Sequence, residues 1–146
     1  MENCVFCNLP EIRDRIVAEN DLAKAFLTNI PIVFGHTLIA SKRCVRSYEE
    51  LTGQEKEAIE SLRALLVKNF MENFGAEGFN FAWNDGKMAG QSVAHFHLHV
   101  IPRKTGDAGI YTYEPREFLY RPKEERPVSL EQELEKTAKE IKSKIS

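Results

Sequence analysis

Residues 84–103 read NDGKMAGQSVAHFHLHVIPR, and this stretch decides the fold that we expect. It holds three of the four histidines of the chain, and they alternate with apolar residues: His95, His97 and His99. Because successive side chains of a β-strand point to opposite faces, the pattern predicts a strand near 93–101 with the three imidazoles on one face. Imidazole acts near neutral pH as a nucleophile, an acid, a base or a metal ligand. The row therefore predicts a functional face, and its chemistry stays open between a catalytic metal and a histidine nucleophile.

The segment that precedes the histidines favours the second of these chemistries. Residues 84–92 are small and polar and include two glycines, so their backbone can approach an anion closely and donate N–H groups to it. The segment offers no second cluster of histidines or carboxylates that would complete a metal shell. The residues therefore favour phosphate chemistry by a histidine, with a metal-dependent hydrolase as the alternative.

Further strands are expected on the N-terminal side of this segment. Residues 16–28 have the pattern of a hairpin, and residues 37–40 that of a short apolar strand. Aromatic residues alternate with polar or small ones over 78–84, as in a half-buried strand, and 85–91 form a turn. Together with the helices, these strands predict an α+β fold with a mainly antiparallel sheet.

Two helices are expected. Thr52 and Glu55 have the spacing of a capping box, so one long helix should begin there and end near Gly75. Its buried face should carry the apolar residues at helical spacing: Ala58, Ile59, Leu62, Leu65, Leu66 and Phe70. A final helix should begin near Ser129, with an inner stripe of Leu130, Leu134, Ala138, Ile141 and Ile145.

Length and composition exclude several classes of protein. The chain has 146 residues, of which 42% are hydrophobic and 29% charged, ordinary values for one globular domain. A net charge of −2 makes no case for a nucleic-acid surface, and no run of residues approaches the roughly 20 apolar ones that cross a membrane. The N-terminus does not have the pattern of a signal peptide, so we expect a cytoplasmic protein without nucleic-acid or membrane partners.

Two of the three cysteines, Cys4 and Cys7, have CxxC spacing. In a reducing compartment this spacing is typical of metal ligands or redox thiols, and an odd number of cysteines argues against a disulfide framework. No thioredoxin-like βαβ pattern follows the pair, which weakens the redox interpretation.

Residues 84–103 resemble the signature of the histidine-triad (HIT) family, His-φ-His-φ-His-φ-φ preceded by that family's phosphate loop. The likeness continues upstream in Ala25-Phe26-Leu27 and in Phe34-Gly35-His36-Thr37-Leu38-Ile39, and it covers about residues 4–106. The resemblance implies a five-stranded, mainly antiparallel sheet with one long helix and a C-terminal helix. It also implies a single histidine-triad domain over 1–146, in which 107–146 are a C-terminal extension.

The resemblance implies a nucleotidyl hydrolase or transferase that cleaves at the α-phosphate. The middle histidine, His97, would be the nucleophile of a covalent intermediate, His99 would contact the phosphate or the leaving group, and His36 would support the site. The expected substrates are dinucleoside polyphosphates, such as diadenosine tetraphosphate, or nucleoside phosphoramidates. Residues 99–107 are more similar to the dinucleoside-polyphosphate branch. A protein that binds nucleotides without turnover remains a further alternative.

The same resemblance implies the residues that hold the substrate. Phosphate contacts would come from Asn84, Gly90, Gln91 and Ser92. Ribose would be bound by Thr28 or Asn29. Family members often have Asp or Asn eight residues before the histidine that matches His36; this position is Thr28 here, and Asn29 follows it. Phe6 and Phe26 would line the base pocket, although core packing explains them equally well.

A structural zinc and a homodimer are also implied by the resemblance. The zinc ligands would be Cys4, Cys7, Cys44 and His95, a closed Cys₃His set with no open position for water. The dimer would form through the long helix and a strand, and the apolar residues Phe70, Phe74 and Trp83 are compatible with such an interface.

Overall fold

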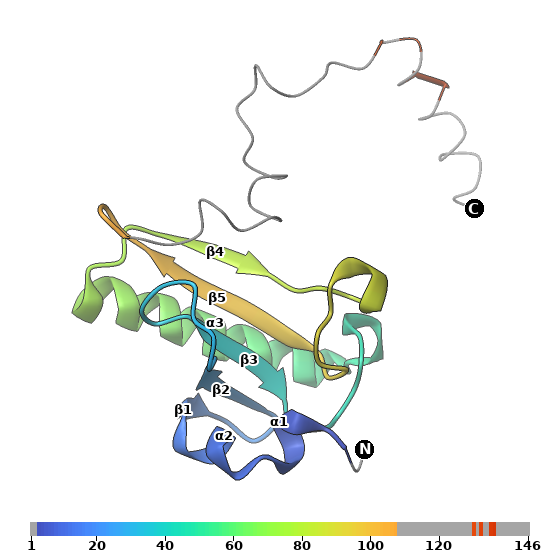
Figure 1. The fold of residues 1–146 in the computed structure, drawn as a ribbon, viewed down its shortest axis with the longest axis horizontal. Helices are drawn as coiled ribbons and strands as arrows, with labels where there is room; N and C mark the ends of the chain where they lie inside the picture. Colours follow the sequence, from blue (N-terminus) through green and yellow to red (C-terminus); the bar gives the residue numbers. More distant parts are fainter. Residues whose placement is uncertain (1–2, 108–129, 131, 133–134, 137–146) are drawn as a thin grey trace. The chain divides into compact units, whose positions relative to one another are not determined.

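The computed structural model describes residues 3–107, 130, 132 and 135–136, and its centre is an antiparallel sheet (Figure 1). The sheet has five strands in the order β1-β2-β3-β5-β4. Their bounds are β1 Ile16–Glu19, β2 Ala23–Leu27, β3 Thr37–Ser41, β4 Gly78–Ala82 and β5 His97–Arg103. Strand β5, which carries the histidines, therefore lies inside the sheet between β3 and β4 and is held on both sides. The expected α+β fold is confirmed.

The helices are one long element and several short ones. They are α1 Val5–Asn8, α2 Pro10–Asp14, the 3₁₀ turn η1 Tyr48–Glu50, α3 Gly53–Phe74 and the 3₁₀ turn η2 Lys87–Ala89. Among the described residues, no helix has the length and apolar character needed to cross a membrane. By its contacts the chain divides into Met1–Gly109 and Ile110–Ser146. The predicted C-terminal helix lies almost entirely outside the described residues, so it stays a prediction, as does the single-domain organisation.

Helix α3 begins at the predicted capping box. The Thr52 hydroxyl accepts the Glu55 N–H at 3.1 Å, and the Glu55 carboxylate accepts the Thr52 N–H at 2.9 Å. The helix ends at Gly75, whose φ of 71° suits a residue without a side chain. The prediction that Leu65 is buried is wrong, since 51% of it is exposed. Only the narrow stripe that faces the sheet is covered, and Leu65 lies on its flank.

The two faces of the sheet pack against different helices. Helix α3 runs behind the sheet in Figure 1, and apolar side chains of β2, β3 and β5 pack against it: Ala23, Ala25, Ile39, Leu98 and Val100. The opposite face carries Phe26, Leu38 and Ala40, which pack with Phe6 of α1 and Ile12 of α2. The short N-terminal helices therefore cover part of the face on which the histidines lie.

Both bounds of strand β5 differ from the predicted ones. Strand β5 begins at His97 and not near 93, because the backbone of residues 93–95 forms a bend. It also continues through Pro102, where a stop was expected. Pairing with β3 ends at Val100, so beyond it the strand needs only β4 as a neighbour, a setting in which proline is tolerated.

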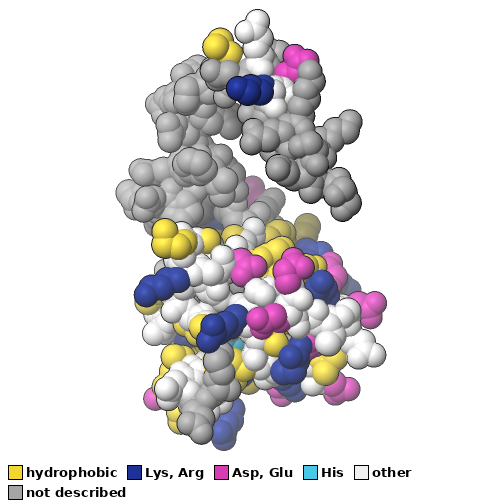
Figure 2. All heavy atoms as spheres, turned by 90° about the vertical axis from the view of Figure 1, so that its right-hand side faces the viewer, with side chains coloured by type: hydrophobic (Ala, Val, Ile, Leu, Met, Phe, Trp, Pro, Cys, Tyr) yellow, Lys and Arg dark blue, Asp and Glu magenta, His cyan; other side chains and the backbone are white. Residues whose placement is uncertain are grey.

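Strand β4 is an edge strand, and its aromatic residues are less covered than predicted. Phe79 packs against the core, but Phe81 and Trp83 are 42% and 44% exposed. Trp83 lies just beyond the end of the strand, where its ring stacks on Tyr48 at 5.0 Å between centroids. Charged side chains of both signs are interspersed on the face of the molecule that Figure 2 shows.

Candidate active site and metal-binding cluster

The sheet brings His97 and His99 to the face opposite helix α3. In the register of the sheet, His97 pairs with Ala40 and His99 with Leu38, whose side chains share that face. The apolar residues between the histidines are in the core on the other face. The predicted division into an imidazole face and an apolar face is therefore confirmed for His97 and His99, whereas His95 lies before the strand.

His97 is oriented by a backbone carbonyl. Its Nδ1–H donates to the His95 carbonyl at 2.8 Å, so the proton of the neutral ring is on Nδ1 and the lone pair is on Nε2. Burial lowers the pKa of His97, which favours this neutral form. No buried side-chain nitrogen or oxygen among the described residues lacks a partner, and no hydrogen bond joins Nε2 to another group. Nε2 must therefore reach the surface, although only 6% of the residue is exposed.

His36 and His99 form a pair with a defined direction. The Ile32 N–H donates to His36 Nδ1 at 3.1 Å, so the proton of neutral His36 is on Nε2. That Nε2–H donates to His99 Nδ1 at 2.9 Å, which places the proton of neutral His99 on its own Nε2. Burial lowers the pKa of both residues to about 4, and for His99 the nearby His97 and His36 add to it. His99 is thus a donor beside His97, whose ring centroid is 5.2 Å away.

A glycine directly precedes His36, which is the last residue before β3. Gly35 has a φ of 88°, and a Cβ at this residue would lie 2.8 Å from the ring of Phe70 on α3. A residue with a side chain would therefore be strained and would also collide with the helix.

The loop over residues 84–92 is closed mainly by its own hydrogen bonds. The N–H groups of Ala89, Gly90 and Gln91 donate to carbonyls within the loop, and the Asn84 amide donates to the Gly90 carbonyl at 3.3 Å. Gly86 and Gly90 have φ of 92° and 91°, which only glycine adopts readily. Ser92 is exposed, and neither its hydroxyl nor its N–H has a partner among the described residues.

The residues expected to hold the nucleoside differ in how far they are buried. Phe6 is buried and its ring meets that of His97 edge-on at 5.1 Å between centroids. Phe26 has no exposed surface and packs against Phe6, so it belongs to the core. Thr28 is half-buried, and its hydroxyl accepts the Ile30 N–H at 3.2 Å, whereas Asn29 is exposed.

The three cysteines and His95 form one cluster. The ligand atoms of Cys4, Cys7, Cys44 and His95 all lie within 4.8 Å of one another. His95 Nδ1 faces the thiols, 3.2 Å from Cys4 Sγ and 3.6 Å from Cys7 Sγ, and His95 Nε2–H donates to the Ser41 carbonyl at 2.7 Å. Ligand atoms around a tetrahedral zinc lie about 3.8 Å apart, given a Zn–S distance of about 2.3 Å. The cluster therefore has the composition, spacing and outer hydrogen bond of a metal site.

The ionisation of the thiols also fits a metal. Burial raises the pKa of Cys4, but hydrogen bonds from Cys44 and Cys7 outweigh this and hold it below its ordinary value. Burial and the neighbouring Cys4 raise the pKa of Cys7 to about 12, and that of Cys44 is raised as well. Ionisation of Cys7 and Cys44 is thus disfavoured beside Cys4, and a bound cation would favour the thiolate form of all three.

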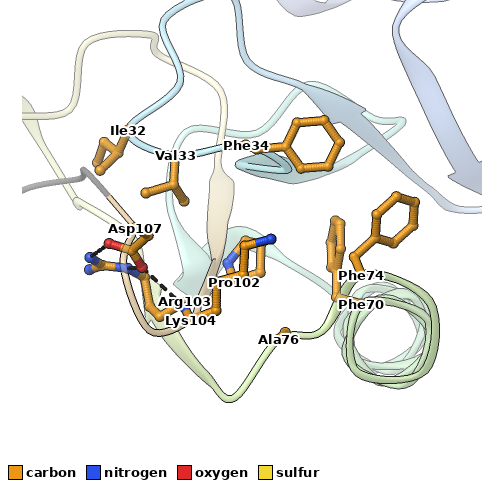
Figure 3. A pocket seen from close by; sticks show the side chains of 10 residues that line it. All are labelled: Ile32, Val33, Phe34, Phe70, Phe74, Ala76, Pro102, Arg103, Lys104 and Asp107. Carbon is orange, nitrogen blue, oxygen red and sulfur yellow. Dashed lines mark hydrogen bonds and ion pairs between the residues drawn. The ribbon is translucent and has the colours of Figure 1, made fainter.

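One cavity of the described body lies away from the histidines. This cavity of about 240 Å³ lies between the loop that contains Phe34, the end of α3 and the end of β5, and Figure 3 shows the side chains that line it. Its walls are mostly apolar, and the ion pair between Arg103 and Asp107 lies at one side. None of the histidines lines it, so we assign it no part in the histidine site.

The part of the site that sequence reasoning missed is made of backbone groups. The carbonyls of Ser41 and Arg46 and the N–H of Ile32 orient His95, Gln91 and His36. Every residue has these groups, so no residue type in the sequence marks them.

The described body is an α+β fold whose inner strand carries alternating histidines next to a glycine-containing loop. The HIT domain family model matches residues 9–106, more than half of the chain. A bis(5'-adenosyl)-triphosphatase from Dictyostelium discoideum is 33% identical over 89% of this chain and 85% of its own length. An adenosine 5'-monophosphoramidase from Schizosaccharomyces pombe is 31% identical over 98% of both chains.

A solved structure with the same fold binds zinc. The crystal structure of a zinc-bound histidine triad family protein from Mycobacterium smegmatis superimposes with a TM-score of 0.65 and 28% identity, covering 75% of this chain and 81% of that one. The chain belongs to the HIT family.

Proposed function

We propose that this protein is a nucleotide hydrolase that acts through a covalent intermediate on His97. The observation that carries the proposal is the state of His97, whose Nδ1–H is held by a carbonyl while its unprotonated Nε2 reaches the surface. The names of the relatives support the substrate class, since one is a dinucleoside triphosphatase and another a nucleoside phosphoramidase. We therefore propose dinucleoside polyphosphates and adenosine phosphoramidates as substrates.

In the first step, Nε2 of His97 attacks the α-phosphorus, and the bond from phosphorus to the bridging oxygen or nitrogen breaks. The ring becomes positively charged as the P–N bond forms, and the His95 carbonyl stabilises that charge through the Nδ1–H bond. His36 fixes the tautomer of His99, so His99 Nε2–H can donate a hydrogen bond to the leaving atom as negative charge develops there. A polyphosphate leaves as an anion, and an amine takes its proton from solvent. In the second step, water attacks phosphorus and releases a proton to solvent, the P–N bond breaks, and His97 returns to its neutral form.

The loop over 84–92 and the residues near α1 and β2 would hold the substrate. Ser92 can donate its hydroxyl and N–H to the phosphate, where negative charge develops. Phe6 would contact the base beside His97, and Thr28 or Asn29 the ribose. Phe26, being fully buried, would support Phe6 from behind.

We also propose that the cysteine cluster holds a structural zinc. Zinc bound by Cys4, Cys7, Cys44 and His95 would tie the N-terminal segment to the start of β5, with no ligand position left for water. Among the described residues, the cysteine cluster is the one group of three or more potential ligands whose atoms lie within 4.8 Å of one another, and neither His97 nor His99 belongs to it. This separation gives no support to the alternative of a catalytic metal held by the row.

A cytoplasmic homodimer is the proposed assembly and location. Edge strand β4 and the exposed rings of Phe81 and Trp83 offer a surface for a second copy, next to a cavity of about 810 Å³. Free thiols at all three cysteines are in keeping with a reducing compartment.

The test is intact-protein mass spectrometry after brief exposure to diadenosine triphosphate or tetraphosphate, with acid avoided. Wild-type protein should gain the mass of an adenosine monophosphate group, and His97→Ala should not. Product formed without an adduct, and abolished by a chelator, would instead support a metal-dependent hydrolase. Neither product nor adduct with any dinucleotide or phosphoramidate would support the non-catalytic binding protein.

A further inference from the structure

Both ends of the Gln91 amide are used inside the protein. Its Oε1 accepts the Gly86 N–H at 2.7 Å, and its Nε2 donates to the Arg46 carbonyl at 2.8 Å. Its own N–H also donates to the Gly86 carbonyl at 3.1 Å. Gln91 thus closes the loop on Gly86 through main chain and side chain, and fastens the closed loop to a segment that follows β3.

The segment to which Gln91 fastens the loop is itself held in place. The Arg46 N–H donates to the Glu50 carboxylate at 3.0 Å. The carbonyl of Val45, a buried residue, accepts the Phe96 N–H at 2.7 Å. Phe96 directly precedes His97, so the Arg46 carbonyl has a fixed position relative to the nucleophile.

We propose that Gln91 is a positioning residue, which holds the loop over 85–92 at a set distance from His97 and does not give its amide to the substrate. The loop then presents Ser92, whose hydroxyl and N–H have no partner among the described residues, to the phosphate. Taking the Gln91 amide for the substrate would break its bond to Arg46 and release the loop at the moment when the phosphate must be held. The substrate part of this inference rests on the proposed function, but the tether itself does not.

The experiment compares Gln91→Met, which has a similar length and no amide, with Gln91→Glu, which keeps the acceptor for Gly86 and loses the donor for Arg46. The matched control is Gln54→Met, at an exposed position in the first turn of α3. The readouts are amide hydrogen exchange over 84–92 in the substrate-free, metal-retaining protein, the Kd for adenosine monophosphate, and kcat and KM with diadenosine triphosphate.

We expect faster exchange in the loop of Gln91→Met, with no change in the rest of the sheet. Its Kd and KM should rise about tenfold, as for the loss of one or two hydrogen bonds, and kcat should fall as well. Gln91→Glu keeps the acceptor for Gly86, but its carboxylate repels the Arg46 carbonyl, so exchange in its loop should also be faster than in wild type. Gln54→Met should match wild type.

Two results would overturn the proposal. Unchanged loop exchange together with a lower kcat would mean that Gln91 acts directly on the substrate. A lower melting temperature with unchanged Kd and KM would mean that the tether only stabilises the fold. If no dinucleotide is turned over but loop exchange and the Kd still respond to Gln91, the proposed function fails and the tether stands.

Discussion

At the scale of single residues, each histidine has a partner that decides which of its nitrogens is available. His97 uses Nδ1 for a carbonyl and keeps Nε2 for chemistry, whereas His95 does the reverse and turns Nδ1 to the thiols. His36 and His99 are joined in a chain that begins at a backbone N–H. Three neighbouring histidines in one sequence pattern are thereby given three different roles.

The depressed pKa of His36 predicts a pH-dependent stability. The ordinary pKa of 6.5 applies to the unfolded chain, while burial lowers that of the folded protein to about 4. Above pH 6.5 the contribution of His36 to stability is complete, and it is lost as the pH falls toward 4, because the unfolded chain binds the proton first. Within that window one such group can contribute a slope of up to about 1.4 kcal/mol per pH unit.

The measurement is urea unfolding at several pH values, for wild type and His36→Gln. A glutamine can accept the Ile32 N–H and donate to His99 without titrating. The variant should therefore lose less stability than wild type between pH 6.5 and 4. Parallel curves for the two proteins would contradict the assigned role of His36.

At the scale of elements, α3 supports the histidine strand from behind. Its buried stripe packs against Leu98 and Val100, the apolar half of the strand whose other half carries His97 and His99. The start of this helix is determined by the capping box and by Arg43, whose guanidinium pairs with the Glu55 carboxylate at 2.7 Å. The position of His97 and His99 therefore depends on α3, although α3 contributes no residue to the histidine site.

Thr52→Ala should destabilise the protein by about 0.5–2 kcal/mol, because the Glu55 N–H loses its acceptor at the N-terminus of α3. Thr52→Ser keeps that acceptor and should cost much less. The free energy of unfolding from urea titration measures both. Equal losses for the two variants would assign the effect to the threonine methyl group and not to the cap.

At the scale of the whole described body, the metal-binding cluster joins distant parts of the chain. Cys4 and Cys7 belong to the N-terminal segment, Cys44 follows β3, and His95 precedes β5. The same His95 supplies the carbonyl that orients His97. Ligands so far apart in sequence come together only in the folded chain, so the free energy of metal binding adds to the stability of the fold.

Purified protein should contain about one zinc per chain, and removing it with a chelator should lower the melting temperature by more than about 5 °C. Cys44→Ser should bind zinc more weakly, whereas Cys44→His should retain it, since imidazole is also a zinc ligand. Metal analysis and thermal unfolding measure these effects. Protein that contains no zinc and does not respond to the chelator would contradict the structural-zinc proposal.

The sequence alone determined the features that depend on neighbouring residues. The alternation of histidine and apolar residues, the capping box of α3 and the hairpin of β1 and β2 are local patterns, and each was predicted correctly. The family resemblance also placed Cys4, Cys7, Cys44 and His95 in one cluster, as the structure does.

Tertiary structure decided what depends on neighbours from elsewhere in the chain. Pairing with β3 and β4 set the bounds of β5, and the exposure of Leu65 and Trp83 followed from the limited area of the sheet and its edge. The tautomers of the histidines and the tether of Gln91 depend on carbonyl and N–H groups that every residue carries. Such groups leave no trace in residue types, so only their positions in the folded chain show which nitrogen of His97 is available to react.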